Sequence, residues 1–334
     1  MKKIKVVQVG LGPLGQKIVR YAVERKGLEI VGAVDPAPDK AGRQLKELCS
    51  LEKGPKITVS PDIGPALKKG KPDVAILTTV SSLERLFPQI EEIGGCGADI
   101  VSTCEELSFP WTTQPALAGR IDRFARKKGI SILGTGINPG FLMDLLPIVL
   151  TGVCQRVESV KISRIQDAAQ RRIPFQKKIG AGLTRDQFEQ KRKAGILRHV
   201  GLAESIHMIA CRLGWRLEKV TETLEPVVAE TGINTGWSEI KPGMVAGVQQ
   251  VGRGYLRSKE VITLYFRASV GEKNPADTIE IRGLPDLTFT IPGGINGDIA
   301  TCAITVNAVK RVAEALPGLK TMADIPPVSF FTGE

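Results

Sequence analysis

Two consecutive carboxylates, Glu105 and Glu106, are the side chains in this sequence best suited to accept a proton. They follow the strand-like run Asp99–Ser102, so a parallel sheet would place them just beyond the carboxyl end of a strand. A carboxylate there can act as a base, and as an anion it stabilises positive charge on a reacting group. We expect Glu105 to face the ligand, with Glu106 as second candidate because neighbouring side chains point in opposite directions. The alternative is that both are solvated residues opening a helix, whose dipole favours acids.

A glycine-rich turn near the N-terminus predicts a site for nucleotide phosphates. Residues 4–9 form a β-branched run, residues 13–26 carry apolar positions at helical spacing, and between them lies Gly10-Leu11-Gly12-Pro13-Leu14-Gly15. In this context Gly10 permits a tight turn, Gly12 lets the backbone approach a pyrophosphate, and Gly15 allows close helix–strand packing. The N–H groups at the helix N-terminus would bind the phosphates of a dinucleotide.

Asp35 predicts which dinucleotide is bound. It ends the strand-like run 28–34 and lies 20 residues after Gly15, where a carboxylate can accept hydrogen bonds from the adenosine ribose hydroxyls. Such a carboxylate repels a 2′-phosphate, which favours NAD over NADP. Lys40 and Arg43 follow closely and can weaken that preference, so NADP stays a second option. Alternatively, Asp35 is only a turn residue before Pro36.

Short stretches of small, mostly polar residues follow the other strand-like runs of this half. We expect them to border the cofactor because open α/β sheets bind ligands at the carboxyl ends of their strands. They are Thr78, Thr79, Val80 and Ser81 after 73–77, Thr103 after 99–102, and Asn138, Pro139 and Gly140, on the nicotinamide side, after 130–133. Thr79 and Ser81 can equally be helix caps, and the Asn138 loop can be a domain-joining turn. The βαβ rhythm predicts an α/β fold with a Rossmann-type, doubly wound parallel sheet.

The pattern changes after Asp144. Longer runs of alternating polarity occupy 156–165, 217–229, 244–254, 259–270 and 277–291, with a predicted helix at 199–213. They predict an inserted α+β domain with an open mixed sheet that is polar on one face. A helix from about 299 to 316 would return to the nucleotide domain. We therefore predict a dinucleotide-binding domain at 1–137 and 295–334, and a substrate-binding and oligomerisation domain at 138–294.

The positive charge of the chain is concentrated in one segment. The sequence has 46 basic and 35 acidic residues, a net charge of +11, and the segment from Lys161 to Lys193 contributes ten basic and three acidic residues, or +7. We interpret this segment as a basic approach for an anionic cofactor or a carboxylate-bearing substrate, with a solvated surface as the alternative. We expect no nucleic-acid partner, because the segment has only two aromatic residues, Phe175 and Phe188, and base-stacking surfaces interleave several.

Other classes of protein are excluded by composition. No apolar window approaches 18 residues, so no membrane-spanning helix is predicted, and 42% hydrophobic residues exclude intrinsic disorder. The six cysteines form no CxxC pair and the two histidines are His199 and His207, so we expect no metal site. Reduced thiols and the absence of a signal-like N-terminus predict a cytoplasmic protein.

The architecture resembles the dihydrodipicolinate reductase-like superfamily over nearly the whole chain. The reductase itself fits poorly, because its paired histidines are absent where residues 163–169 read Ser-Arg-Ile-Gln-Asp-Ala-Ala. A closer resemblance is to the branch containing 2,4-diaminopentanoate dehydrogenase and the native amine dehydrogenases. The shared features are the glycine turn, the run STCEEL at 102–107, NPGF at 138–141, IPGGINGDIATCAITVNA at 291–308, and the tail at 317–324.

The resemblance implies reversible, nicotinamide-dependent oxidative deamination of an amine, or reductive amination of a carbonyl compound with ammonia. Glu105 or Glu106 would act beside the reacting nitrogen, and Phe141, Thr301 and Cys302 would line the substrate pocket. Arg164 can pair with a substrate carboxylate, and His199 is a further candidate contact. The alternatives are a charge on a strand surface for Arg164 and a helix-start residue without a catalytic task for His199.

Two competing functions remain at this stage. One is another imine or carbonyl reductase on the same scaffold, and the other is a nicotinamide-sensing regulator that binds nucleic acid through its basic segment. No helix-turn-helix, zinc-finger or RNA-recognition signature supports the regulator. We also expect a homodimer, because a sheet with one exposed face commonly buries it against a second copy.

Overall fold

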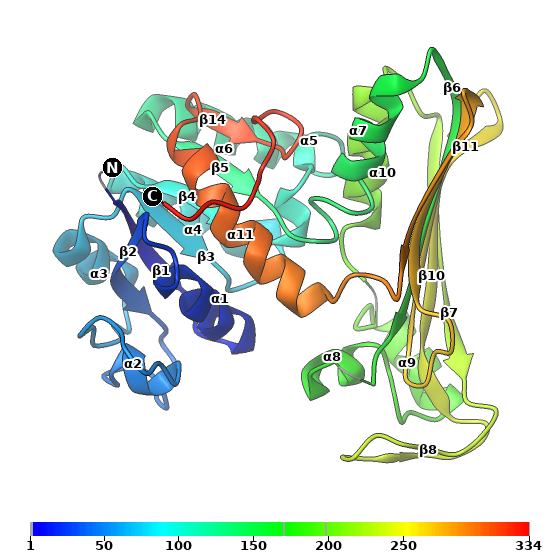
Figure 1. Cartoon of the computed structure of the whole chain (residues 1–334), viewed down its shortest axis with the longest axis horizontal. Coiled ribbons are helices and arrows are strands. Elements are labelled where there is room, and N and C mark those ends of the chain that lie inside the picture. The colour runs from blue at the N-terminus through cyan, green and yellow to red at the C-terminus, as the bar shows by residue number, and fades with distance from the viewer. Residues whose placement is uncertain (1–2, 170, 198, 334) are drawn as a thin grey trace. The chain divides into compact units, whose positions relative to one another are not determined.

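The chain divides into two compact units. The computed structural model describes residues 3–169, 171–197 and 199–333 (Figure 1). Unit 1 comprises residues 1–142 and 297–334, and unit 2 comprises residues 143–296. The unit boundaries lie a few residues beyond the domain boundaries predicted from the sequence.

Unit 1 contains a six-stranded parallel sheet, which confirms the predicted Rossmann-type fold. The strand order reverses between β1 and β3, and such a switch point opens a ligand crevice at the carboxyl ends of the strands. In spatial order the strands are β14 (Gly318–Lys320), β5 (Ser131–Gly134), β4 (Asp99–Ser102), β3 (Val74–Leu77), β1 (Ile4–Val9) and β2 (Leu28–Val34).

Helices cover both faces of this sheet (Figure 1). On one face lie α1 (Pro13–Val23) and α11 (Gly297–Ala313), the returning helix predicted from the sequence. On the other face lies α4 (Leu83–Gly95), which directs Leu83, Leu86 and Ile90 into the core at helical spacing. The remaining helices of unit 1 are α2 (Leu45–Leu48), α3 (Ile63–Gly70), η1 (Glu105–Leu107), α5 (Pro110–Thr113) and α6 (Pro115–Lys128).

Unit 2 contains the predicted mixed sheet. β6 and β11 are parallel, and the other neighbouring pairs are antiparallel. The predicted strand at 277–291 is instead a hairpin, because Pro285 interrupts the ladder and Asp286 accepts a hydrogen bond from the N–H of Gly283. The spatial order is β13 (Leu287–Pro292), β12 (Ala276–Leu284), β6 (Arg156–Asp167), β11 (Lys259–Ser269), β10 (Val245–Leu256) and β7 (Lys219–Val228).

The two faces of this second sheet differ in polarity. On the inner face Ile162 and Leu264 pack against α10 (Leu202–Arg212). The outer face carries partly exposed polar side chains such as Lys161 and Tyr265, in agreement with the predicted alternation. The other elements of unit 2 are α7 (Leu145–Leu150), η2 (Thr151–Val153), α8 (Ile173–Lys178), α9 (Arg185–Lys193), β8 (Ile233–Asn234) and β9 (Glu239–Ile240).

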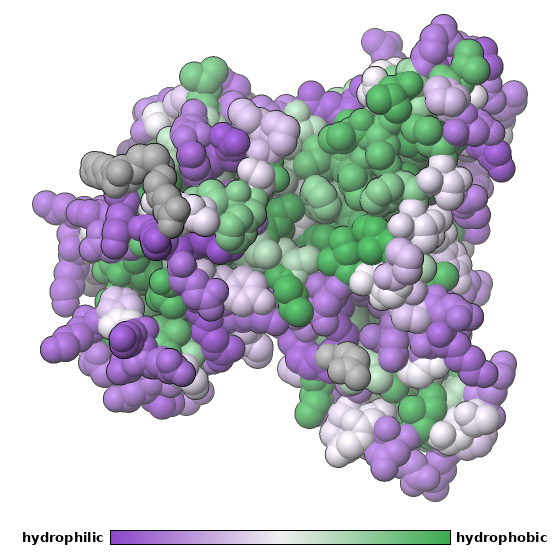
Figure 2. Space-filling model, viewed as in Figure 1, coloured by the Kyte–Doolittle hydropathy of each residue, from purple (hydrophilic) through white to green (hydrophobic). Residues whose placement is uncertain are grey.

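Apolar side chains also reach the surface of unit 2. Figure 2 shows them gathered over α7 and the following η2, where Val149 and Val153 are exposed. In the described part of the chain, no helix combines the length and apolar character needed to cross a membrane.

Candidate active site

Close backbone packing around the glycine turn explains why two of its positions require glycine. Gly10 has φ +89°, and a Cβ there would lie 2.6 Å from the carbonyl oxygen of Thr78. A Cβ on Gly15 would lie 2.0 Å from the carbonyl oxygen of Gly10, so the helix meets the strand only without a side chain. Around Gly12 no atom lies within 4 Å of a Cβ position, which leaves its backbone open to a ligand.

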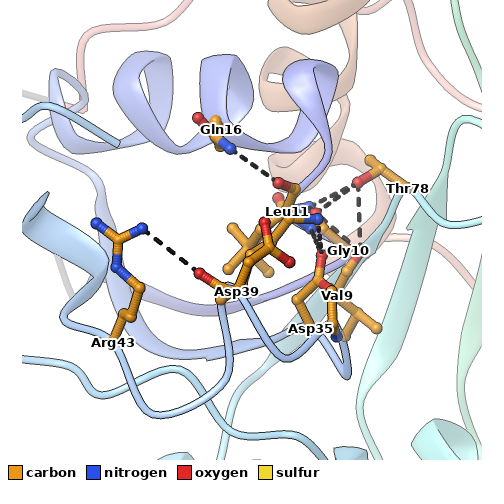
Figure 3. A network of polar contacts seen from close by, with 11 residues as sticks. Val9, Gly10, Leu11, Gln16, Asp35, Asp39, Arg43 and Thr78 are labelled. Atoms are coloured by element: carbon orange, nitrogen blue, oxygen red, sulfur yellow. Dashed lines mark hydrogen bonds and ion pairs between the residues drawn. The ribbon is translucent and has the colours of Figure 1, made fainter. Parts of the chain in front are cut away.

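The buried side-chain amide of Gln8 holds the glycine turn in place through hydrogen bonds. Gln8 donates from Nε2 to the carbonyl oxygen of Gly10 at 2.9 Å and to Oγ1 of Thr78 at 2.9 Å. The Thr78 hydroxyl in turn donates to the Gly10 carbonyl at 2.9 Å (Figure 3). Gln8 was not predicted from the sequence, although its signal is a polar residue flanked by the apolar Val7 and Val9 in β1.

Asp35 joins the end of β2 to the same turn. Its Oδ2 accepts hydrogen bonds from the Leu11 N–H at 2.8 Å and from Lys40 Nζ at 3.0 Å, and its Oδ1 accepts the Ala37 N–H at 3.0 Å. Burial acts to raise the pKa of Asp35, but the two backbone N–H groups and Lys40 together lower it, so the group is a carboxylate at neutral pH.

The turn and Asp35 border one cleft of about 540 Å³ within unit 1. Of the predicted cofactor residues, the cleft brings together Gly10, Gly12, Asp35, Thr78 and Thr79. Its other lining residues are Val9, Val34, Pro36, Lys40, Pro61, Asp62, Ile63, Gln89 and Glu92. Leu11 is fully buried, and the Thr79 hydroxyl donates to Gln89 at 2.8 Å.

The two candidate carboxylates occupy different surroundings, although both are half-buried at the start of η1. Glu106 Oε2 accepts the N–H of Leu83, the first residue of α4, at 2.8 Å and the side-chain amide of Gln114 at 2.8 Å. These contacts tie η1 to the start of α4 and to the α5–α6 junction. These contacts give Glu106 a structural task, and Glu105 stays the first candidate for the chemistry.

The cysteine before this pair is held as a thiol. Cys104 is buried and donates from Sγ to the carbonyl oxygen of Ser81 at 3.1 Å. Burial, reinforced by the charge of Glu105, raises the pKa of the Cys104 thiol. A thiolate is therefore disfavoured, and Cys104 links the residues that follow β3 and β4.

The predicted nicotinamide loop, residues 138–140, contacts the returning helix. The N–H of Ile137, just before the loop, donates to Thr301 Oγ1 on α11 at 3.3 Å. Gly140 has φ +122°, and a Cβ there would lie 2.5 Å from the backbone nitrogen of Gly136, so the turn requires glycine. Cys302, also on α11, is fully buried with its Sγ 3.8 Å from the carbonyl oxygen of Leu14 in the glycine turn. Phe141 is half-buried.

Arg164 is buried on the inner face of the second sheet and is not a surface charge. Only 1% of the residue is exposed, and its guanidinium contacts Asp277 at 3.2 Å and the Ile295 carbonyl oxygen at 2.9 Å. Burial lowers the pKa of Arg164 to about 10, while Asp277 acts in the opposite direction. Burial likewise raises the pKa of Asp277.

His199 is held on the same inner face before α10. Gln250 accepts the His199 N–H at 2.8 Å and donates to its carbonyl oxygen at 3.0 Å, and the imidazole stacks on Phe266 with ring centroids 4.5 Å apart. Burial, followed by the charges of Lys178, Arg164 and Arg171, lowers the pKa of His199 to about 3. The imidazole is therefore neutral at physiological pH and can form hydrogen bonds but does not carry charge. Gln250 was not predicted from the sequence.

A parallel sheet with its switch point beside a glycine turn, and a carboxylate at the end of the next strand, are the features of a Rossmann-type dinucleotide-binding domain. In the described ranges, no group of histidine, cysteine and acidic side chains could hold a metal ion.

Comparison with known proteins identifies the branch within this class. A family model, the 2,4-diaminopentanoate dehydrogenase C-terminal domain, matches residues 141–334. The chain is 32% identical over 333 residues to a 2,4-diaminopentanoate dehydrogenase of Acetoanaerobium sticklandii, covering 98% of this chain and 94% of the relative. It is 22% identical to an amine dehydrogenase of Streptomyces virginiae, covering 97% of this chain and 96% of the relative. The chain belongs to the 2,4-diaminopentanoate dehydrogenase family, which confirms the resemblance seen in the sequence and identifies an oxidoreductase acting on CH–NH2 groups.

A solved structure shows the same fold. The amine dehydrogenase from Mycobacterium smegmatis superposes with a TM-score of 0.88 at 22% identity, with 98% of each chain covered.

Proposed function

We propose that the protein catalyses the reversible oxidative deamination of an amine with NAD as hydride acceptor. Membership of the family supports the type of reaction. The observation that carries the proposal is the position of Glu105. It follows β4, which pairs with β3, and β3 pairs with β1, so the carboxylate and the glycine turn lie at the carboxyl edge of one sheet, two strands apart.

The cleft of unit 1 fits a dinucleotide. The open backbone at Gly12 would accommodate the pyrophosphate, and Asp35 would accept hydrogen bonds from the adenosine ribose. When bound, NAD would supply the hydride acceptor. The Asp35 carboxylate would repel the 2′-phosphate of NADP, while the Lys40 ammonium, 3.0 Å from Oδ2, would weaken that repulsion. We therefore expect NAD to be preferred and NADP to be accepted more weakly.

Glu105 would act at the nitrogen and carbon of the substrate. As a base it would accept a proton from the substrate ammonium, because only the neutral amine readily gives up a hydride from its carbon. After passing that proton to solvent, Glu105 would be an anion again and would stabilise the positive charge of the substrate iminium that forms. It would then receive a proton from the water that attacks the iminium carbon and return it to the nitrogen. As ammonia leaves and the carbonyl forms, it would take the hydroxyl proton. Glu106 would keep η1 in place through Leu83 and Gln114.

The charges around His199 favour an amine that carries a carboxylate, such as 2,4-diaminopentanoate. Lys178, Arg164 and Arg171 all act on the pKa of this one imidazole, so positive charge converges there within unit 2. Arg171 also stacks over Phe175, with the guanidinium carbon 4.0 Å from the ring centroid. A carboxylate bound near Lys178 and Arg171 would be stabilised electrostatically, whereas Arg164 is already paired with Asp277, and the neutral His199 would add a hydrogen bond.

We also propose that the protein is a homodimer. The support is the outer face of the second sheet, where the partly exposed Tyr265 and Arg267 of β11 lie opposite Ser163 and Ile165 of β6. Sedimentation equilibrium at micromolar concentration should give twice the chain mass, and a monomer would contradict the proposal.

An NAD-reduction assay with a panel of amines tests the function. Oxidation of 2,4-diaminopentanoate or simple alkyl amines should produce NADH and ammonia in equal amounts. Reduction of cyclic imines without ammonia exchange would instead indicate an imine reductase. If the protein oxidises no amine and binds DNA or RNA with steep salt dependence, the regulator is the correct function.

A further inference from the structure

The backbone of Ile295 is held from both sides two residues before α11 begins. Its N–H donates to Asp277 Oδ2 at 2.7 Å, and its carbonyl oxygen accepts from Arg164 Nη2 at 2.9 Å. Gln166 donates to the same carbonyl oxygen at 3.0 Å. Ile295 ends a short segment in which Gly293 and Gly294 have positive φ, so this stretch lacks the restraints of a regular strand.

The pair that holds Ile295 is buried and lies on neighbouring strands. Asp277 on β12 is directly opposite Arg164 on β6, with 3.2 Å between Arg164 Nη1 and Asp277 Oδ2. Side-chain exposure is 2% for Arg164 and 1% for Asp277. A charged pair is costly to bury, so its presence beside the apolar Ile162 and Ile279 requires an explanation beyond stability.

A second pair on the same two strands provides a contrast. Lys161 and Glu280 also face each other across β6 and β12, with 3.0 Å between Nζ and Oε2. Their side chains are 55% and 36% exposed on the outer face. An exposed pair of this kind contributes little to stability.

We propose that Arg164 and Asp277 are positioning residues that clamp the peptide groups of Ile295 and thereby fix where the connecting segment leaves the sheet to enter α11. Displacement of that segment would move the first turns of α11, which carry Thr301. Thr301 accepts the N–H of Ile137, the residue before the predicted nicotinamide loop. The clamp therefore acts on the reaction through the backbone, without contact between Arg164 and the substrate.

This assignment differs measurably from substrate binding by Arg164. A substrate-binding arginine matters only for amines that carry a carboxylate, and Asp277 would then be dispensable. A clamp matters equally for every amine and needs both members of the pair.

The test compares Arg164→Met, Arg164→Lys and Asp277→Asn with the matched control Glu280→Gln. Hydrogen–deuterium exchange is followed in peptides covering 291–298, because local opening governs amide exchange. Steady-state rates are measured with an alkyl amine and with 2,4-diaminopentanoate, and NADH affinity is measured separately. The activity readout relies on the proposed function, whereas the exchange readout does not.

The clamp predicts faster exchange in 291–298, by about tenfold or more, in Arg164→Met and Asp277→Asn but not in Glu280→Gln. For both substrates kcat/KM should fall by the same factor, about tenfold or more, at unchanged NADH affinity. Arg164→Lys, which keeps the charge facing Asp277, should recover part of both losses and carries the test if Arg164→Met does not fold. Unchanged exchange in 291–298, or a loss confined to the carboxylated amine and to Arg164 variants, would overturn the proposal. If the wild type oxidises no amine, the proposed function fails, and exchange alone decides the clamp.

Discussion

Alanine at Gly12 and at Gly15 should damage the protein in two different ways, although the residues lie in the same turn. At Gly15 the new Cβ would lie 2.0 Å from the Gly10 carbonyl oxygen and 2.9 Å from Thr78 Oγ1. That oxygen cannot yield easily, because Gln8 and Thr78 both donate hydrogen bonds to it. At Gly12 the Cβ would meet no protein atom within 4 Å.

The expected magnitudes follow from these distances. Gly15→Ala forces a backbone shift, and such overpacking costs about 3 kcal/mol, partly offset by the helix preference of alanine. In a protein of this size the melting temperature should fall by about 5 °C. Gly12 has φ −63° and ψ 178°, which alanine adopts without strain, so Gly12→Ala should leave unfolding within about 0.5 kcal/mol of wild type. Its methyl group would occupy the approach of the pyrophosphate and weaken NADH binding by about tenfold or more.

Thermal unfolding and NADH fluorescence titration of both variants measure these effects. Gly15→Ala should lose stability and NADH affinity together, while Gly12→Ala should lose NADH affinity alone. Wild-type NADH affinity in Gly12→Ala would refute the placement of the pyrophosphate, and wild-type stability in Gly15→Ala would refute the described packing.

Three further predictions concern charge. Lys40→Met should increase the preference for NAD over NADP about fivefold, measured as the ratio of kcat/KM values, because Asp35 loses its ion pair; an unchanged ratio would contradict this role. Burial, with a contribution from the neighbouring Asp73, raises the pKa of Asp99 from 3.8 to about 6. The folded state therefore binds a proton more tightly than the unfolded state, and the free energy of unfolding should fall as pH rises from about 4 to 6. Asp99→Asn keeps an oxygen for the Ser131 N–H and should abolish that fall, leaving the variant more stable at pH 8 by about 1 kcal/mol after allowance for solvent screening; an unaltered pH profile in chemical denaturation would count against it. Neutralising the basic cluster should raise KM for a carboxylated amine at low salt and leave KM for alkyl amines unchanged, whereas no effect would make the cluster a solvated surface; the residues changed are Arg171, Arg172, Lys177 and Lys178.

The nucleotide-binding unit was largely predictable because its signals are local. The strand, turn and helix around Gly10 lie within one short segment, and the requirement for glycine at 10 and 15 follows from backbone contacts that the motif encodes. Asp35 follows the next strand. Such patterns report the periodicity of adjacent residues, which fixes the local structure.

Long-range pairing was not predictable. Glu106 contacts Leu83, 23 residues away, and Arg164 contacts Asp277, 113 residues away, so local alternation could not show what Glu106 holds or what the arginine binds. Gln8 and Gln250 were missed for the same reason. Each looks like an ordinary polar residue in a strand, and their partners Thr78 and His199 lie 70 and 51 residues away. The hairpin at Pro285 was merged into one strand although proline already marks a break there.

The most direct test of the central claim is the rate of amine oxidation by Glu105→Gln, measured beside Glu106→Gln. We predict that Glu105→Gln binds NADH like the wild type and lowers kcat by about 100-fold or more, since it cannot accept a proton. Glu106→Gln should mainly lower the melting temperature, because its carboxylate holds the start of α4. Near-wild-type turnover by Glu105→Gln would contradict the assignment of the catalytic base.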